Sequence, residues 1–132
     1  MLVKQIMSSP AICVDYKTPI DNVVNIMRKE NLGFLPVTKD DILIGVVTDR
    51  DILLRKDKYT KHIDEVMSKD NLHTIDMAFP LEEAAKIMST YKVRRLVVTH
   101  DNLIKGVITS KDLLYQDDLL PYIKQTYINI GY

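Results

Sequence analysis

Hydrophobic residues along this chain follow two patterns, one with the period of an amphipathic helix and one with the density of a buried strand. Each half carries one helical face with apolar residues at i, i+1, i+3 and i+4. These residues are Val23, Val24, Ile26 and Met27, and then Ala84, Ala85, Ile87 and Met88. Two β-rich runs follow each face, at Phe34–Thr38 and Leu43–Thr48 and again at Arg95–Thr99 and Ile104–Thr109. The polar segments between them, Lys39–Asp41 and His100–Asn102, have the length of hairpin turns.

A short strand before each helix and a short helix after each hairpin complete the pattern. We expect the first strands around Ile12–Val14 and His73–Ile75. Thr18 is a good N-cap for the first helix, and Pro19 suits the helix's first turn. The candidate N-caps of the short helices are Thr48 or Asp49, and Thr109 or Ser110. The order strand, helix, strand, strand, helix in each half predicts an α/β (α+β) fold.

The two halves are copies of one sequence. A shift of 61 places superimposes Asp15–Leu53 on Asp76–Leu114, and 13 of these 39 pairs are identical. About two or three identities are expected by chance if about 6% of random pairs agree. A segment just upstream, Ile6–Ser8, matches Val66–Ser68 at a shift of 60. The chain is therefore an internal duplication with a period of about sixty residues.

The duplication predicts the domain organisation. We expect a first repeat over residues 1–60, a second over 61–116, and a helical tail over 117–132 that starts near Pro121. A half of this size buries little surface alone, so the two β-α-β-β-α repeats should pack about a pseudo-twofold axis and form two matching clefts. The apolar residues of the tail require a cover, which is either the chain's own repeats or a dimer or partner contact.

One repeated stretch carries candidate chemistry. Gly45-Val-Val-Thr48-Asp-Arg-Asp51 recurs as Gly106-Val-Ile-Thr109-Ser-Lys-Asp112. A strand that ends in a hydroxyl before a helix start presents backbone N–H groups, a Thr Oγ1 and, one turn on, a carboxylate. The carboxylate can accept hydrogen bonds from two adjacent hydroxyls, so the set suits a ribose with a phosphate attached. The alternative is purely structural: both threonines are helix caps, and both aspartates are favourable acids in a first turn.

Composition and charge exclude several classes of function. Eighteen basic and eighteen acidic residues cancel, so no overall positive field exists to hold nucleic acid or an anionic membrane. The apolar runs are too short for a membrane helix, and we expect a cytoplasmic protein. The single Cys13 forms no internal disulfide. His62, His73 and His100 lack the spacing of a metal site, and no catalytic motif is visible, so we expect neither a metal nor an enzyme.

The chain from about Val3 to Tyr115 resembles a tandem pair of cystathionine-β-synthase (CBS) domains, the Bateman module. The stretches that carry this resemblance are Met7-Ser8-x-Pro10, Gly33-Phe34-Leu35-Pro36-Val37 and Gly45-Val-Val-Thr48-x-x-Asp51, with Met67-Ser68, Val93-Arg94-Arg95-Leu96-Val97-Val98 and Gly106-Val-Ile-Thr109-x-x-Asp112 in the second copy. The resemblance implies a regulatory module that binds AMP, ADP, ATP, S-adenosylmethionine or a related adenosyl compound in the clefts between the copies.

The resemblance also implies roles for single residues. Asp51 and Asp112 would hold the ribose hydroxyls, and Thr48 and Thr109 would contact ribose or phosphate. Each cleft would borrow adenine-binding backbone from the other copy's first strand. The Asp112 cleft would then use Ser8, Pro10 and Ile12, and the Asp51 cleft would use Ser68, Leu72 and His73.

The two clefts are expected to differ. Phosphates would be reached by Arg94 and Arg95 in the second copy, where the first copy has Gly33 and Phe34. Weaker candidate phosphate contacts are Lys111 and Arg50. We therefore expect the Asp112 cleft to be the principal site and the Asp51 cleft to be empty or to take a ligand without a phosphate chain.

Two functions are consistent with the sequence. The first is a homodimeric sensor that binds an adenosine nucleotide and signals to a protein partner. The second is a dimerisation or docking scaffold whose clefts are filled by side chains, which the Gly33-Phe34 edge favours.

Overall fold

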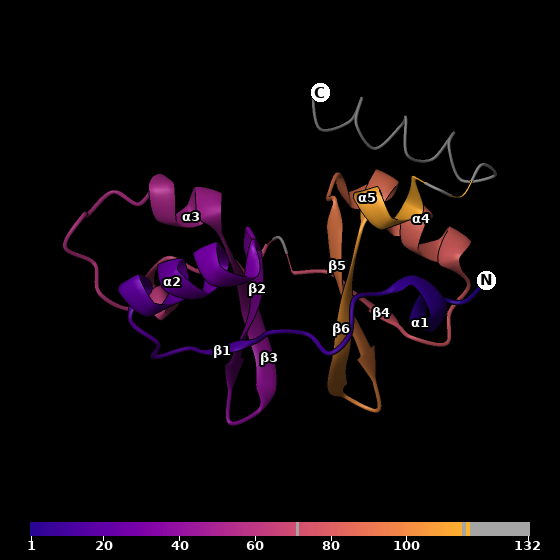
Figure 1. Ribbon diagram of the computed structural model, residues 1–132, viewed down its shortest axis with the longest axis horizontal. Coiled ribbons are helices and arrows are strands. Elements are labelled where there is room, and N and C mark those ends of the chain that lie inside the picture. The colour runs from indigo at the N-terminus through magenta and orange to yellow at the C-terminus, as the bar shows by residue number, and fades with distance from the viewer. Residues whose placement is uncertain (71, 115, 117–132) are drawn as a thin grey trace. The chain divides into compact units, whose positions relative to one another are not determined.

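The chain forms two compact units, each built on one three-stranded sheet (Figure 1). The computed structural model describes residues 1–70, 72–114 and 116. Of the described residues, those within 12–72 form the first-repeat unit, and those within 1–11 and 73–116 form the second-repeat unit. The predicted helical tail, residues 117–132, lies outside the described residues.

The first-repeat unit follows the predicted order of elements. Its strands are β1 (Val14–Asp15), β2 (Phe34–Lys39) and β3 (Ile42–Thr48), and its helices are α2 (Ile20–Glu30), α3 (Asp49–Leu53) and the 3-10 turn η1 (Ile63–Glu65). Strand β1 pairs in parallel with β2, which pairs antiparallel with β3. A parallel pair requires a crossover connection, and α2 supplies it.

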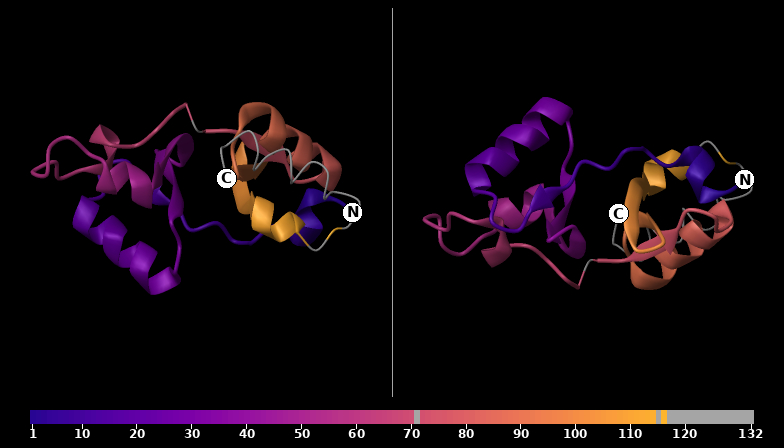
Figure 2. Two further views of the ribbon diagram at one scale, coloured as in Figure 1. Left: turned by 90° about the horizontal axis from the view of Figure 1, so that it is seen from above. Right: turned by 90° about the horizontal axis from the view of Figure 1, so that it is seen from below.

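The second-repeat unit has the same architecture. Its strands are β4 (Thr74–Asp76), β5 (Arg95–His100) and β6 (Leu103–Thr109), and its helices are α1 (Val3–Ile6), α4 (Leu81–Tyr91) and α5 (Ser110–Leu113). Even the irregularity in the sheet is repeated, because the register shifts after Val37 in one unit and after Val98 in the other. In each unit the helices cover one face of the sheet (Figure 2). The predicted α/β class with two β-α-β-β-α repeats is confirmed.

Each unit has its own hydrophobic core, and the predicted helical faces supply the helix side of it. Val23 and Met27 are buried against Leu35 and Val47 of the sheet in the first-repeat unit. In the second-repeat unit Ala84, Ala85 and Met88 are buried against residues that include Leu96 and Ile108. The core of the second-repeat unit also includes Val3, which is fully buried and comes from the opposite end of the chain.

The N-cap of the first long helix differs from the prediction. Pro19, not Thr18, occupies this position in α2, with the extended backbone of a cap residue and no side-chain hydrogen bond. Pro80 does the same for α4. The first helical N–H groups find backbone partners instead, because Ile20 N donates to Lys61 O over 2.7 Å. A capping side chain is unnecessary where tertiary structure supplies the acceptor.

The hairpin turns are one residue shorter than predicted. Lys39 pairs with Ile42 and His100 pairs with Leu103, so each turn has two residues. Asp40, Asp41, Asp101 and Asn102 all have positive φ, between 50° and 65°. Positive φ at both central positions defines a type I′ turn, whose twist matches the flanking strands. Asp and Asn tolerate this conformation better than other residues with a side chain.

The short helices begin at the threonines. Thr48 Oγ1 accepts a hydrogen bond from Asp51 N over 3.0 Å, and the Asp51 carboxylate accepts one from Thr48 N over 2.9 Å. Thr109 and Asp112 form the same reciprocal capping box at the start of α5. Of the two candidate caps in each copy, the threonine is the one used.

Residues 1–11 complete the second-repeat unit rather than the first. Ser8 and Val107 exchange two backbone hydrogen bonds of 2.9 and 3.0 Å at the edge of β6. Val3 N also donates to Phe79 O over 2.9 Å. Figures 1 and 2 show this indigo segment lying along the orange elements of the second-repeat unit. The first-repeat unit is completed equivalently, because Ser68 exchanges two backbone bonds with Val46 of β3 over 2.8 and 2.9 Å.

Glycine is required where these segments cross the strand edge. A Cβ atom at Gly106 would overlap the carbonyl oxygen of Ser8, which is backbone and cannot rotate away. At Gly45 the corresponding contact with the Ser68 oxygen would be 3.1 Å, which is tight but not an overlap. Both glycines therefore permit a backbone-to-backbone approach, and the constraint is stricter at Gly106.

We predict that Gly106→Ala destabilises the protein more than Gly45→Ala does. Overpacking against a fixed backbone atom costs about 1–3 kcal/mol, and the lower end applies where a shift of a few tenths of an ångström suffices. Urea denaturation of both variants measures the difference. Limited proteolysis should show faster cleavage within residues 1–11 in Gly106→Ala only, because that segment is displaced. Equal stabilities and equal cleavage would contradict this steric explanation.

We further predict that Thr48→Ala and Thr109→Ala each lower the free energy of unfolding by about 1 kcal/mol, the usual cost of a lost N-cap. Thr48→Ser and Thr109→Ser are the matched controls, because serine keeps the capping hydroxyl. Thermal and urea denaturation check the prediction. A serine variant as unstable as its alanine counterpart would show that the methyl group, not the cap, stabilises the site.

Candidate functional site

The repeated aspartates have a defined orientation that the capping box imposes. In the second-repeat unit Asp112 Oδ2 accepts hydrogen bonds from Thr109 N over 2.8 Å and from Thr109 Oγ1 over 3.1 Å. Asp51 Oδ2 accepts the equivalent backbone bond from Thr48 N, over 2.9 Å. Both aspartates are partly exposed, so Oδ1 can accept hydrogen bonds from a ligand.

The two arginines of the second copy are joined through the backbone to the residues at the start of α5. Arg95 is the cross-strand partner of Thr109 in the antiparallel β5–β6 pair. Arg94 O accepts a hydrogen bond of 2.8 Å from Ser110 N, which joins the start of β5 to the start of α5. The strand pairing and the helix start thus bring together five residues, which we call the second-repeat corner: Arg94, Arg95, Thr109, Ser110 and Asp112. Lys111, also a predicted site residue, is exposed on α5 between Ser110 and Asp112.

The N-terminal segment pairs with β6 on the edge of that strand that does not face β5. Ser8 pairs with Val107, two residues before Thr109 on β6. Ser9 Oγ donates to Lys105 O over 3.0 Å, and Pro10 is exposed immediately after it. Ser8 and Pro10 therefore belong to the same unit as Asp112. Ile12 belongs to the first-repeat unit, so its predicted role beside Asp112 stays a prediction.

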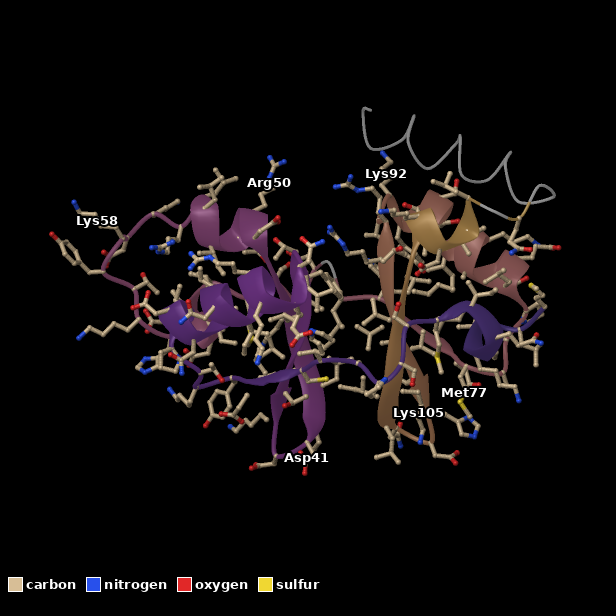
Figure 3. All side chains as sticks on the ribbon, in the orientation of Figure 1. Asp41, Arg50, Lys58, Met77, Lys92 and Lys105 are labelled. Atoms are coloured by element: carbon tan, nitrogen blue, oxygen red, sulfur yellow. The ribbon has the colours of Figure 1, made fainter. Side chains whose placement is uncertain are left out.

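The first-repeat unit has the equivalent arrangement with different side chains. Phe34 is the cross-strand partner of Thr48, and Asp49 N donates to Gly33 O over 2.9 Å. We call the equivalent set of five residues the first-repeat corner: Gly33, Phe34, Thr48, Asp49 and Asp51. Arg50 lies between Asp49 and Asp51, and its side chain extends outward from α3 (Figure 3).

The two predicted partners at residues 72 and 73 fall in different units. Leu72, like Ser68, belongs to the first-repeat unit together with Asp51. His73 belongs to the second-repeat unit, where its carbonyl oxygen accepts a hydrogen bond of 3.0 Å from Val97 N. The His73 ring stacks on Tyr91 with centroids 4.5 Å apart. Its predicted role beside Asp51 remains a prediction.

Two features of the site were not anticipated from the sequence. The close approach of Ser8 to Gly106 was missed, although Gly45 and Gly106 are among the identical pairs of the repeat. The sequence predicts Asp49 only as an alternative N-cap. Its carboxylate instead lies against Gly33, so that a Cβ atom at Gly33 would be 2.8 Å from Asp49 Oδ2. The sequence shows Asp49 opposite Ser110 in the repeat, but not this contact.

The remaining titratable groups give no sign of metal or thiol chemistry in the described part of the chain. No group of three or more His, Cys, Asp or Glu residues is arranged there to hold a metal ion. Burial raises the pKa of the Cys13 thiol, which keeps it protonated at neutral pH. The Asp76 carboxylate has a lowered pKa because it accepts a hydrogen bond from Ala78 N and another from His100. None of the helices in the described residues is long and apolar enough to cross a membrane.

Comparison with known proteins places this arrangement in a family. The CBS domain family model matches the chain twice, over residues 3–57 and 63–117. The CBS domain-containing protein YhcV of Bacillus subtilis is 32% identical over 116 residues, which cover 84% of this chain and 81% of that protein. Inosine-5′-monophosphate dehydrogenase of Aquifex aeolicus is 34% identical over 106 residues, or 78% of this chain. This chain spans only 22% of that enzyme's length.

A solved structure supports the same assignment. The CBS domain pair of protein MJ0100, in complex with 5′-methylthioadenosine and S-adenosyl-L-methionine, superposes with a TM-score of 0.78 and 29% identity. The match covers 92% of this chain and 96% of that one. With two matches to one family model, a repeated fold and a structural relative that spans nearly the whole chain, this protein belongs to the CBS domain family as a tandem CBS pair, the Bateman module.

Proposed function

We propose that this chain is a regulatory module that binds an adenosine nucleotide (AMP, ADP or ATP) or a related adenosyl compound, with the second-repeat corner as its principal site. The observation that carries the proposal is the convergence of one oriented carboxylate, Asp112, with Arg94 and Arg95 on adjoining elements. A nucleotide carries both groups that such a set recognises, namely a vicinal diol and an anionic phosphate.

Each side chain has a separate task in this proposal. Asp112 Oδ1 accepts hydrogen bonds from the ribose hydroxyls. Oδ2 keeps its hydrogen bond in the capping box and so holds the carboxylate in place. Arg95 and Arg94 contact the phosphate. A planar guanidinium group can donate hydrogen bonds to two phosphate oxygens at once. Thr109 contacts the ribose or the phosphate, and Lys111 is a weaker phosphate contact. Backbone groups around Ser8 and Pro10 face the base.

The relatives support a sensing role rather than catalysis. The MJ0100 domain pair shares the fold and was solved with two adenosyl compounds. The match to inosine-5′-monophosphate dehydrogenase spans about a fifth of that enzyme. In our proposal this chain catalyses no reaction itself, works in the cytoplasm as a homodimer, and passes its occupancy to a protein partner. A ligand does so only to the extent that it binds one arrangement of the module more tightly than another.

We predict that the two halves of the site can be separated by mutation. Isothermal titration calorimetry should show that Arg95→Ala weakens AMP and ATP binding about tenfold, the scale of one charge-assisted hydrogen bond, and leaves adenosine binding unchanged. Asp112→Ala should weaken adenosine, AMP, ATP and S-adenosylmethionine alike, because all contain the ribose diol.

Two further variants separate the ribose contact from helix capping. Asp112→Asn retains an oxygen that can accept the bond from Thr109 N but loses the charge. Asp51→Ala removes the equivalent cap from the other unit. We expect Asp112→Asn to weaken binding at the principal site and Asp51→Ala to leave that site unchanged. Unaltered affinity in both Asp112→Ala and Arg95→Ala would overturn the assignment of these residues.

A ligand-free dimerisation or docking scaffold is the competing function, and Phe34, which is only 8% exposed where the other copy has Arg95, favours it. A thermal-shift screen with adenine and guanine nucleotides distinguishes the two functions. A ligand at 100 times its Kd adds about 2.7 kcal/mol of stability, which is readily detected. Stabilisation by an adenosine compound supports the sensor, and the absence of any shift supports the scaffold.

A further inference from the structure

The two corners have opposite charge although their backbones match. The second-repeat corner and Lys111 contribute three cations and one carboxylate, from Arg94, Arg95, Lys111 and Asp112. The equivalent positions of the first repeat, including Arg50, contribute one cation and two carboxylates. The same fold therefore presents a cationic surface in one unit and an anionic surface in the other.

Asp49 accounts for one of the three charges by which the corners differ, and its position is specific. Asp49 N donates to Gly33 O over 2.9 Å, just as Ser110 N donates to Arg94 O over 2.8 Å. Position 33 is thus the counterpart of the arginine, and position 49 the counterpart of the serine. In the first-repeat unit the carboxylate of Asp49 lies against the Cα of Gly33, with Oδ2 2.8 Å from where a Cβ would be. An anion therefore occupies the space in which the other unit starts an arginine side chain.

Gly33 leaves room for the carboxylate of Asp49 in the orientation observed. Any side chain at position 33 would displace the carboxylate, because a Cβ atom would also be 3.2 Å from Asp49 Cγ. The carboxylate is further oriented by Arg50 N, which donates to Asp49 Oδ1 over 2.8 Å. Glycine at this position therefore permits this orientation of the Asp49 carboxylate.

A carboxylate in this position selects against phosphate. A nucleoside bound through its ribose diol to Asp51 would direct its 5′ group toward Gly33 and Phe34. These are the counterparts of the two arginines in the other unit. A 5′-phosphate is anionic and would be repelled by Asp49, whereas a neutral 5′ group would be tolerated and a cationic one attracted. Asp49 is exposed, so the effect should weaken as salt concentration rises.

We propose that Asp49 is a specificity-determining residue that makes the first-repeat corner a site for nucleosides with a neutral or positively charged 5′ group. This inference rests on the proposed function, because it assumes that Asp51 holds a ribose. The module then binds two different ligands, a nucleotide at the second-repeat corner and an uncharged or cationic nucleoside at the first-repeat corner.

The test uses the full chain carrying Asp112→Asn, which weakens binding at the second-repeat corner. The first-repeat corner is then reported by the part of the binding that changes when position 49 is substituted. The probes are AMP, adenosine and 5′-amino-5′-deoxyadenosine, which share base and ribose and differ in the charge of the 5′ group. Calorimetric titration should rank the amino nucleoside tightest and AMP weakest. Asp49→Ser, which installs the residue found in the other copy, should reduce the ratio of the amino nucleoside's affinity to that of AMP at least tenfold. The ratio should also fall between 50 mM and 500 mM KCl.

Asp21→Ser is the matched control, because it removes an exposed carboxylate from the first turn of α2 in the same unit. Gly33 follows the far end of this 11-residue helix, which places Asp21 about 15 Å from the corner. The control should leave the affinity ratio unchanged. An equal change in Asp49→Ser and Asp21→Ser, or no change in Asp49→Ser, would overturn the specificity role of Asp49.

The wild-type chain separates this inference from the function on which it rests. If AMP binds the wild type in an Asp112-dependent manner but no probe binds the Asp112→Asn chain, the inference about Asp49 fails and the proposed function stands. If none of the three probes binds the wild type, the proposed function fails, and the inference fails with it.

Discussion

Backbone pairing between Ser8 and Val107 is the contact on which the architecture of the second-repeat unit depends. It attaches the first eleven residues to a unit whose other elements begin about sixty residues later. Ser8 thereby lies opposite Val107, two residues before Thr109 on β6, while backbone bonds from Val3 to Phe79 and from Lys4 to Met77 hold Val3 in that unit's core. The absence of a side chain at Gly106 makes the approach possible. One steric condition therefore controls how the N-terminal segment meets the strand that leads to the candidate site.

In the proposed function, capping and ligand binding use different atoms of the same carboxylate. Asp112 Oδ2 closes the capping box at the start of α5, so the helix start itself fixes the direction of Oδ1. A side chain already ordered in the unliganded protein loses little conformational entropy when it binds. The structural and functional interpretations of the Thr-x-x-Asp stretch are thus compatible, because the cap orients the group that the ligand would contact. The same logic applies to Thr48 and Asp51.

The duplication preserved the scaffold while a few surface positions determined the chemistry of each copy. Both hairpins keep a two-residue turn and both sheets keep the same register shift, because these features involve backbone geometry and buried residues. Where Arg94 and Ser110 stand in one copy, Gly33 and Asp49 stand in the other, at no cost to the backbone bond that joins the two positions. A module with two similar units can in this way acquire two different ligand preferences.

The sequence by itself determined the repeat, the order of elements, the buried helical faces and the family, because each is recorded in local periodicity or in residues at fixed spacing. It also indicated that the two copies carry different charges beside Asp51 and Asp112. Only the tertiary structure decided that Pro19 rather than Thr18 caps α2, that residues 1–11 complete the second-repeat unit, and that Asp49 lies against Gly33. These features depend on acceptors and contacts supplied by segments distant in sequence, and no local pattern encodes which distant segment will supply them.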